Sequence, residues 1–149
     1  MAETILYILS MLLVGFLEEL IFRGLLFKAL IKEGLPMAIL VSSITFGIGH
    51  LVNLVNGSQM ELFSNLLQVI YAMSAGFMFT LLFYCSNSLY ACILCHGIFN
   101  ALSVFANEAA MTMQQEIFSA LMLCLITTGY SLYLWFNFFI PNYKKSQSQ

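Results

Sequence analysis

The sequence predicts an all-α fold, a polytopic bundle of about five transmembrane helices, and three observations support this fold class. First, 61% of the 149 residues are hydrophobic and only 8% are charged, whereas a soluble domain carries about 25% charged residues. Second, the mean hydropathy is +0.92. Third, the apolar residues gather in stretches of about 20 residues, the length that a helix needs to cross a bilayer. We interpret residues 1–149 as a single membrane-embedded domain.

The first two predicted helices meet at a glycine and a proline. The first apolar stretch runs from about Thr4 to Leu30, and Gly34 beyond it suits the positive φ of a helix C-cap. Pro36 suits the first turn of the second helix, which is expected from about Leu35 to Val55. The apolar N-terminus has no basic segment and no small-residue cleavage site, so we predict a retained span and not a signal peptide.

Polar segments bound the third and fourth predicted helices. The segment Asn56-Gly57-Ser58 is a turn signal, and the third helix is expected after it from about Met60 to Tyr84. The segment Ser86-Asn87-Ser88 can form a turn and cap a helix. The fourth helix is therefore expected from about Leu89 to Ala106.

The fifth helix is predicted from about Ile117 to Ile140. A polar loop from Asn107 to Glu116 precedes it. Pro141 is expected to stop it, because proline lacks the N–H that continues a helix. The tail, residues 141–149, is polar and is predicted to be flexible.

The few basic residues predict the orientation of the bundle. Lys28 and Lys32 flank the first loop, and Lys144 and Lys145 follow the last span. Positive charges mark the cytoplasmic side of a membrane, and with five spans these two sites lie on the same side. We therefore predict a multi-pass protein of the cell membrane with its N-terminus outside and its C-terminus in the cytoplasm. No basic patch suited to nucleic acid is present.

Small residues inside the predicted spans have packing roles in this interpretation. The cysteines lie in or beside apolar stretches, which is not the pattern of a secreted disulfide framework. We expect free thiols at Cys85, Cys92, Cys95 and Cys124. Glycines let membrane helices approach closely, and we expect this of Gly15, Gly24, Gly47, Gly49, Gly76 and Gly97.

Ionisable and polar residues inside the predicted spans are expensive in a bilayer and usually functional. They form three groups, which are Glu18, Glu19 and Arg23; Phe46 and His50; and His96 and Asn100. Glu19 and Arg23 are four residues apart, so they can pair along one helix face. Glu18 points roughly 100° away from Glu19 and is left for another partner. Phe46 lies one turn before His50 and is placed to pack against its ring.

The depths of these groups predict a shared pocket. At about 1.5 Å per residue from the predicted cytoplasmic ends, Glu18 and His50 lie roughly 18–20 Å deep, and Asn100 and His96 lie roughly 12–18 Å deep. In such a pocket a carboxylate can act as a general base, with a histidine beside it to share a proton. A second histidine and an amide can donate hydrogen bonds to an oxyanion. These groups are sufficient to hydrolyse a peptide bond with an activated water.

The three groups in this order resemble the CAAX prenyl protease and bacteriocin-processing (Abi) family of intramembrane endopeptidases. The motifs are Glu18-Glu19-x-x-x-Arg23, Phe46-x-x-x-His50 and His96-x-x-x-Asn100. The resemblance implies that Glu18 activates the water with help from His50, that His96 and Asn100 form the oxyanion site, and that Glu19 and Arg23 hold the geometry. It also implies a glutamate-dependent mechanism with no required cofactor. Members usually carry further helices before the Glu-Glu helix, so we expect a minimal or N-terminally shortened member.

Two alternatives remain open from the sequence. Glu18, His50 and His96 could hold zinc with an open water position, which would make the enzyme metal-dependent. A non-catalytic membrane adaptor or immunity protein could also keep this fold. The expected partners are the lipid bilayer and a peptide or protein at the membrane, either prenylated or of the bacteriocin type.

Overall fold

A computed structural model describes residues 1–56, 61–105, 111–141 and 143. It contains four helices that are long and apolar enough to cross a membrane, and a shorter apolar helix at Leu89–Phe105. The predicted helical membrane bundle is therefore confirmed. Several predictions lie outside the described residues: residues 57 and 58 of the first turn signal, residues 107–110 of the second loop, and residue 142 and residues 144–149 of the tail, including its lysines.

The first span is one continuous helical rod from Ala2 to Glu33, of 32 residues. It consists of α1 (Ala2–Glu19), the π-helical η1 (Leu20–Phe27), α2 (Lys28–Leu30) and the 3-10 turn η2 (Ile31–Glu33). The α-helix thus changes to a π-helix directly after the Glu18-Glu19 pair. Such π-helical insertions occur frequently at functional sites.

The second span begins as predicted, because Gly34 has φ 123°, a conformation that favours glycine, and Pro36 lies in the first turn of α3. Helix α3 (Leu35–Gly49) continues as the 3-10 turn η3 (His50–Leu54). His50 is therefore the residue at which the α-helix ends.

The third span and the shorter apolar helix after it are joined by the predicted polar turn. Helix α4 (Leu62–Ser86) ends at Asn87, which adopts the left-handed conformation with φ 50°. The Ser88 hydroxyl then accepts a hydrogen bond from the Ala91 N–H and caps α5 (Leu89–Leu102). A short 3-10 turn, η4 (Ser103–Phe105), follows.

Two predicted boundaries of the last helix were wrong. Helix α6 runs over Met113–Leu134, so it begins four residues before the predicted start at Ile117. It can begin there because Thr112 and Gln115 form a capping box that satisfies the first N–H groups. The π-helical η6 (Trp135–Phe139) follows, and helical conformation continues through Pro141. The fixed φ of proline is itself helical, so Pro141 removes one hydrogen bond without breaking the last turn.

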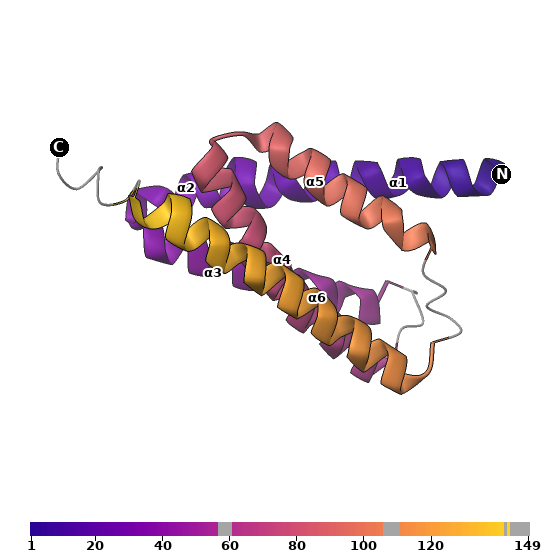
Figure 1. Ribbon diagram of the computed structural model, residues 1–149. Coiled ribbons are helices and arrows are strands. Elements are labelled where there is room, and N and C mark those ends of the chain that lie inside the picture. Colours follow the sequence, from indigo (N-terminus) through magenta and orange to yellow (C-terminus); the bar gives the residue numbers. More distant parts are fainter. Residues whose placement is uncertain (57–60, 106–110, 142, 144–149) are drawn as a thin grey trace.

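The helices pack tightly at one end of the bundle and diverge at the other (Figure 1). Helices α1 and α5 lie side by side and run in opposite directions, and α4 packs against both α3 and α6. The turns between α2 and α3 and between α4 and α5 lie at the tight end with the end of α6, while the N-terminus lies at the divergent end. The largest buried apolar cluster fills the tight end and comprises Phe27, Ala38, Ile39, Leu81, Phe83, Cys92, Leu134 and Phe139.

Glycines bring two helix pairs into backbone contact. A Cβ atom on Gly47 of α3 would lie 2.9 Å from the backbone N of Met73 and from the carbonyl O of Val69, both in α4. A Cβ atom on Gly15 of α1 would meet the backbone of Gly97 in α5 just as closely. The predicted role of glycine in close helix contact is confirmed at these positions.

Candidate active site

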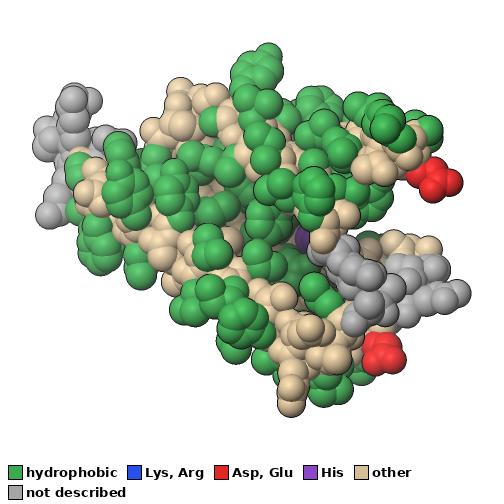
Figure 2. Space-filling model, turned by 45° about the vertical axis from the view of Figure 1, so that its right-hand side comes forward, with side chains coloured by type: hydrophobic (Ala, Val, Ile, Leu, Met, Phe, Trp, Pro, Cys, Tyr) green, Lys and Arg blue, Asp and Glu red, His purple; other side chains and the backbone are tan. Residues whose placement is uncertain are grey.

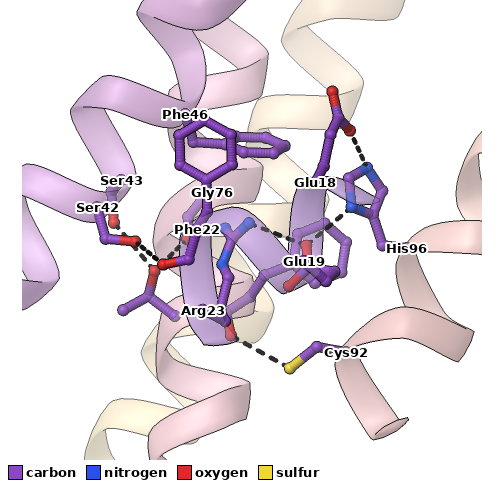
Figure 3. Close-up of polar contacts among 12 residues, drawn as sticks. Glu18, Glu19, Phe22, Arg23, Ser42, Ser43, Phe46, Gly76, Cys92 and His96 are labelled. Atoms are coloured by element: carbon purple, nitrogen blue, oxygen red, sulfur yellow. Dashed lines mark hydrogen bonds and ion pairs between the residues drawn. The ribbon is translucent and has the colours of Figure 1, made fainter. Parts of the chain in front are cut away.

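The crossing of α1 and α5 positions the two acidic residues beside a histidine. Glu18 and Glu19 lie one turn beyond Gly15 on α1, and His96 precedes Gly97 on α5. Because the two backbones touch at these glycines, the imidazole of His96 reaches the carboxylates of α1 (Figure 3).

His96 lies between the two carboxylates and contacts one with each ring nitrogen. Its Nδ1 is 2.8 Å from Oε1 of Glu19, and its Nε2 is 3.4 Å from Oε2 of Glu18. Glu19 is completely buried and His96 is 4% exposed, whereas the Glu18 side chain is 27% exposed. Glu18 is thus the carboxylate that a water or a substrate can reach.

The hydrogen-bond partners determine where the protons lie. Oε1 of ionised Glu19 can only accept, so Nδ1 of His96 carries a proton. On the other side of the ring, Nε2 of His96 lies 3.4 Å from Oε2 of Glu18, and the two groups form an ion pair when the ring is protonated.

Arg23 compensates the charge of the inner carboxylate. Its Nη1 donates to Oε1 of Glu19 at 2.9 Å, and its Nη2 donates to the carbonyl O of Gly76 in α4 at 2.8 Å. Both charged side chains are completely buried, so the predicted pairing of Glu19 and Arg23 is present. Within the described part of the chain, Oε2 of Glu19 and Nε of Arg23 have no hydrogen-bond partner.

Phe46 contacts both histidines and the arginine of the site. Its ring packs edge-on against the ring of His50, with centroids 5.4 Å apart, as predicted. The same ring lies 5.6 Å from the ring of His96 and 4.5 Å from the guanidinium carbon of Arg23. Phe46, which is 2% exposed, therefore separates the two histidines and supports the cation of Arg23.

His50 is oriented by its own helix. Its Nδ1 lies 3.1 Å from the carbonyl O of Phe46. A carbonyl can only accept, so Nδ1 carries the proton, and Nε2 of the neutral ring is a proton acceptor. Among the described residues, His50 makes no direct hydrogen bond to Glu18.

Asn100 is the predicted site residue that the structure connects least. It lies one turn beyond His96 on α5 and is half-buried. Its carbonyl O accepts from the Ser103 hydroxyl at 2.6 Å. The described residues offer its amide no hydrogen bond, so its predicted role remains a prediction.

Helix α4 supplies contacts that the sequence alone did not indicate. The ring of Phe79 stacks on His96 with centroids 4.7 Å apart, and the carbonyl of Gly76 accepts from Arg23. The buried Asn65 donates to the carbonyl O of His50. Because α4 contains no charged residue, no pattern in the sequence pointed to these residues.

The site is open toward the divergent end of the bundle. Figure 2 shows a hollow between the α1–α5 pair and the helices below it, with a histidine side chain visible inside and acidic side chains on both rims. The sequence has two histidines, His50 and His96, and both belong to this site. The hollow therefore leads to the candidate active site.

The zinc alternative does not fit the described residues. Among residues 1–56, 61–105, 111–141 and 143, no group of three or more histidine, cysteine or acidic side chains is arranged to hold a metal ion. Of the three proposed ligands, His96 is already bonded through Nδ1 to Glu19, and the ring of Phe46 packs against both imidazoles.

The comparisons with known proteins identify the family. Residues 1–102 match the family described as type II CAAX prenyl endopeptidase Rce1-like. No curated protein and no solved structure matches the chain. The matched residues include every group of the candidate active site, and α6 lies beyond them. The chain is therefore an integral membrane protein that belongs to the Rce1-like family of type II CAAX prenyl endopeptidases.

Proposed function

We propose that the chain is an active intramembrane endopeptidase of the cell membrane in which Glu18 activates the attacking water. One observation carries the proposal: the accessible carboxylate of Glu18 faces Nε2 of His96, while the other ring nitrogen is held by the buried Glu19. This arrangement couples the protonation of Glu18 to that of His96. Proton transfer is what general acid–base catalysis of hydrolysis requires.

The proposed reaction begins with Glu18 ionised and His96 as the imidazolium. A water bound at Glu18 attacks the carbonyl carbon of the scissile peptide bond and gives one proton to the Glu18 carboxylate. The resulting C–O⁻ group is the oxyanion, and the bond to the leaving nitrogen then breaks. Glu18 passes the proton to that nitrogen, so the products are a carboxylic acid and an amine, and the enzyme returns to its starting state.

The remaining polar groups of the site are assigned to orienting the attacking water and to stabilising the oxyanion. The Nε2 atom of neutral His50 can accept a hydrogen bond from the water and orient it toward the substrate. Imidazolium His96 is a donor for the oxyanion, and Asn100, one turn further along α5, is assigned as the second donor. Glu19 and Arg23 keep His96 in place. No metal or other cofactor is needed in this scheme.

The proposed substrate is a peptide that reaches the hollow from the membrane. The family description makes a prenylated CAAX peptide the first probe. A bacteriocin-type leader peptide is the second probe, since maturation of such peptides, or self-immunity to them, is the other role that we propose for the site.

The test uses purified full-length protein in liposomes with internally quenched peptides: a farnesylated CAAX peptide, its unprenylated form and a bacteriocin-type leader. The wild type is compared with Glu18→Gln and with Glu3→Gln, a control at an exposed position of the same helix. We expect Glu18→Gln to lose about 10²–10⁴-fold in rate and Glu3→Gln to match the wild type. Full activity of Glu18→Gln would overturn the mechanism. A wild type that cleaves none of the probes would favour the alternative of a non-catalytic membrane adaptor or immunity protein.

A further inference from the structure

His50 lies at a weak point of the fold. It is the residue at which α3 ends and the 3-10 turn η3 begins. The last carbonyls of an α-helix lack intrahelical partners, and 3-10 turns have poorer hydrogen-bond geometry than α-helices. The ring of His50 is held by the carbonyl of Phe46, but that bond alone does not fix where the backbone of His50 lies relative to α1 and α5.

The backbone of His50 is fixed from α4. Asn65, which is completely buried, donates from Nδ2 to the carbonyl O of His50 at 2.9 Å. The same Nδ2 lies 3.4 Å from Oε1 of Gln68, and that oxygen accepts from Nδ2 of Asn53 at 2.8 Å. The η3 turn is thus tied to α4 at His50 and at Asn53 by three neutral amide side chains.

We propose that Asn65 is a positioning residue for catalysis, which acts by setting the position of His50. The inference rests on the proposed function, since it assigns a purpose to the orientation of His50. It adds a residue of α4 that lies outside the three sequence motifs. Asn65 donates directly to the backbone of His50, and this bond is the route by which we infer that it affects the reaction.

The position of the His50 backbone determines where Nε2 of its ring points. Nε2 of His50 is the end of the ring that is not bonded to Phe46, and in the proposed mechanism it orients the water. A shift of about 1 Å in such a group can cost about 10²-fold in rate. Without the donor of Asn65, the His50 carbonyl loses a buried partner, and the turn that carries the ring can shift.

The kinetic test separates positioning from general loss of structure. Asn65→Leu keeps the number and branching of the side-chain heavy atoms and removes the hydrogen-bond donor. The matched control is Ser131→Ala, which removes a buried hydroxyl bonded to the Thr127 carbonyl within α6. Asn65→Leu is expected to lower kcat about 10–100-fold with KM changed less than about 3-fold, and Ser131→Ala to change neither. An unchanged kcat, or a change in KM alone, would overturn the proposal.

A second measurement does not depend on activity. In a His96→Gln background, His50 is the only histidine, and the ¹⁵N chemical shifts of its ring report which nitrogen carries the proton. We expect one Nδ1-protonated form with Asn65 present, and a mixture or a shifted signal in Asn65→Leu. Identical spectra would overturn the proposal. A changed spectrum in a chain that cleaves no peptide would instead mean that the proposed function fails while the link between Asn65 and His50 holds.

A milder variant covers the case in which Asn65→Leu does not fold. Gln68→Met, at a half-buried position, removes the acceptor shared by Asn53 and Asn65. It should change kcat and the His50 spectrum in the same direction, by a smaller factor. If folded Gln68→Met leaves both kcat and the spectrum at their wild-type values, the amide cluster does not position His50 and the proposal is wrong.

Discussion

A Cβ atom placed on Gly15 would lie 2.9 Å from both the Cα and the backbone N of Gly97, so α1 and α5 touch along their backbones. The contact is adjacent to His96 and one turn before the two glutamates. Its closeness sets how far the imidazole of His96 reaches between the carboxylates of Glu18 and Glu19. The candidate active site therefore depends on two residues that have no side chain.

Adding a methyl group at these two glycines should have unequal effects. In Gly15→Ala the methyl meets the backbone of Gly97, which cannot move aside, so we expect a stability loss of about 1–3 kcal/mol and a strong loss of activity. In Gly97→Ala the methyl meets the end of the Leu12 side chain at 3.1 Å, which can rotate away. Unfolding titrations in mixed micelles and the peptide-cleavage assay check both variants. Equal effects would contradict the importance of the backbone contact at Gly15.

Removing Arg23 should unfold the site. In Arg23→Met the buried carboxylate of Glu19 loses its counter-charge, which is expected to cost about 3–5 kcal/mol. The double variant Glu19→Leu/Arg23→Met removes both charges and should recover much of the folded yield, because an apolar pair of similar volume replaces the ion pair. It should remain inactive, since His96 loses its inner anchor. Folded yield is measured by size-exclusion chromatography. A folded yield of Arg23→Met equal to that of the wild type would show that the ion pair is not needed for folding.

Replacing Phe46 should lower stability and activity more than replacing a lipid-facing phenylalanine. Phe46→Ala leaves a cavity between the two histidines and removes the ring under Arg23, so a loss of about 3–5 kcal/mol is expected. Phe136→Ala is the control, because Phe136 is 63% exposed in the bundle and should change little. The two variants are compared by unfolding titration and by kcat. Similar behaviour would mean that the contacts of Phe46 with the rings do not hold the site together.

Metal removal should leave the activity intact. The described residues offer no cluster that fits a metal ion, and the proposed steps use the protons of Glu18 and the histidines. Protein dialysed against EDTA and 1,10-phenanthroline is therefore expected to cleave the probe peptide at the untreated rate. A loss of activity that is restored by added zinc, but not by magnesium, would contradict the metal-free mechanism and support the zinc-dependent alternative.

Local features of the fold followed from the sequence because they depend on neighbouring residues. The apolar stretches predicted the spans, Gly34 and Pro36 predicted the junction of the first two, and Ser88 predicted a cap. The pairing of Glu19 with Arg23 followed from their spacing of four residues on one helix. The capping box at Thr112 was also readable from its spacing and was missed.

The contacts between helices were decided by the tertiary structure. The sequence placed Glu18, His50 and His96 at similar depths, but the fold made His96, and not His50, the direct neighbour of Glu18. It also brought in Phe79 and Asn65 from α4, which carries no charge to mark it.

The reason is that a membrane helix is surrounded by lipid as apolar as its own core. In a soluble helix the polar face shows which side packs inward, and here both sides are apolar. Hydropathy can therefore say that a helix spans the membrane, but not which of its faces meets a neighbour. The sequence by itself determined the apolar helices, the cap at Ser88 and the ionisable groups of the candidate site. Only the close packing at glycines such as Gly15 and Gly97 decided which of those groups touch.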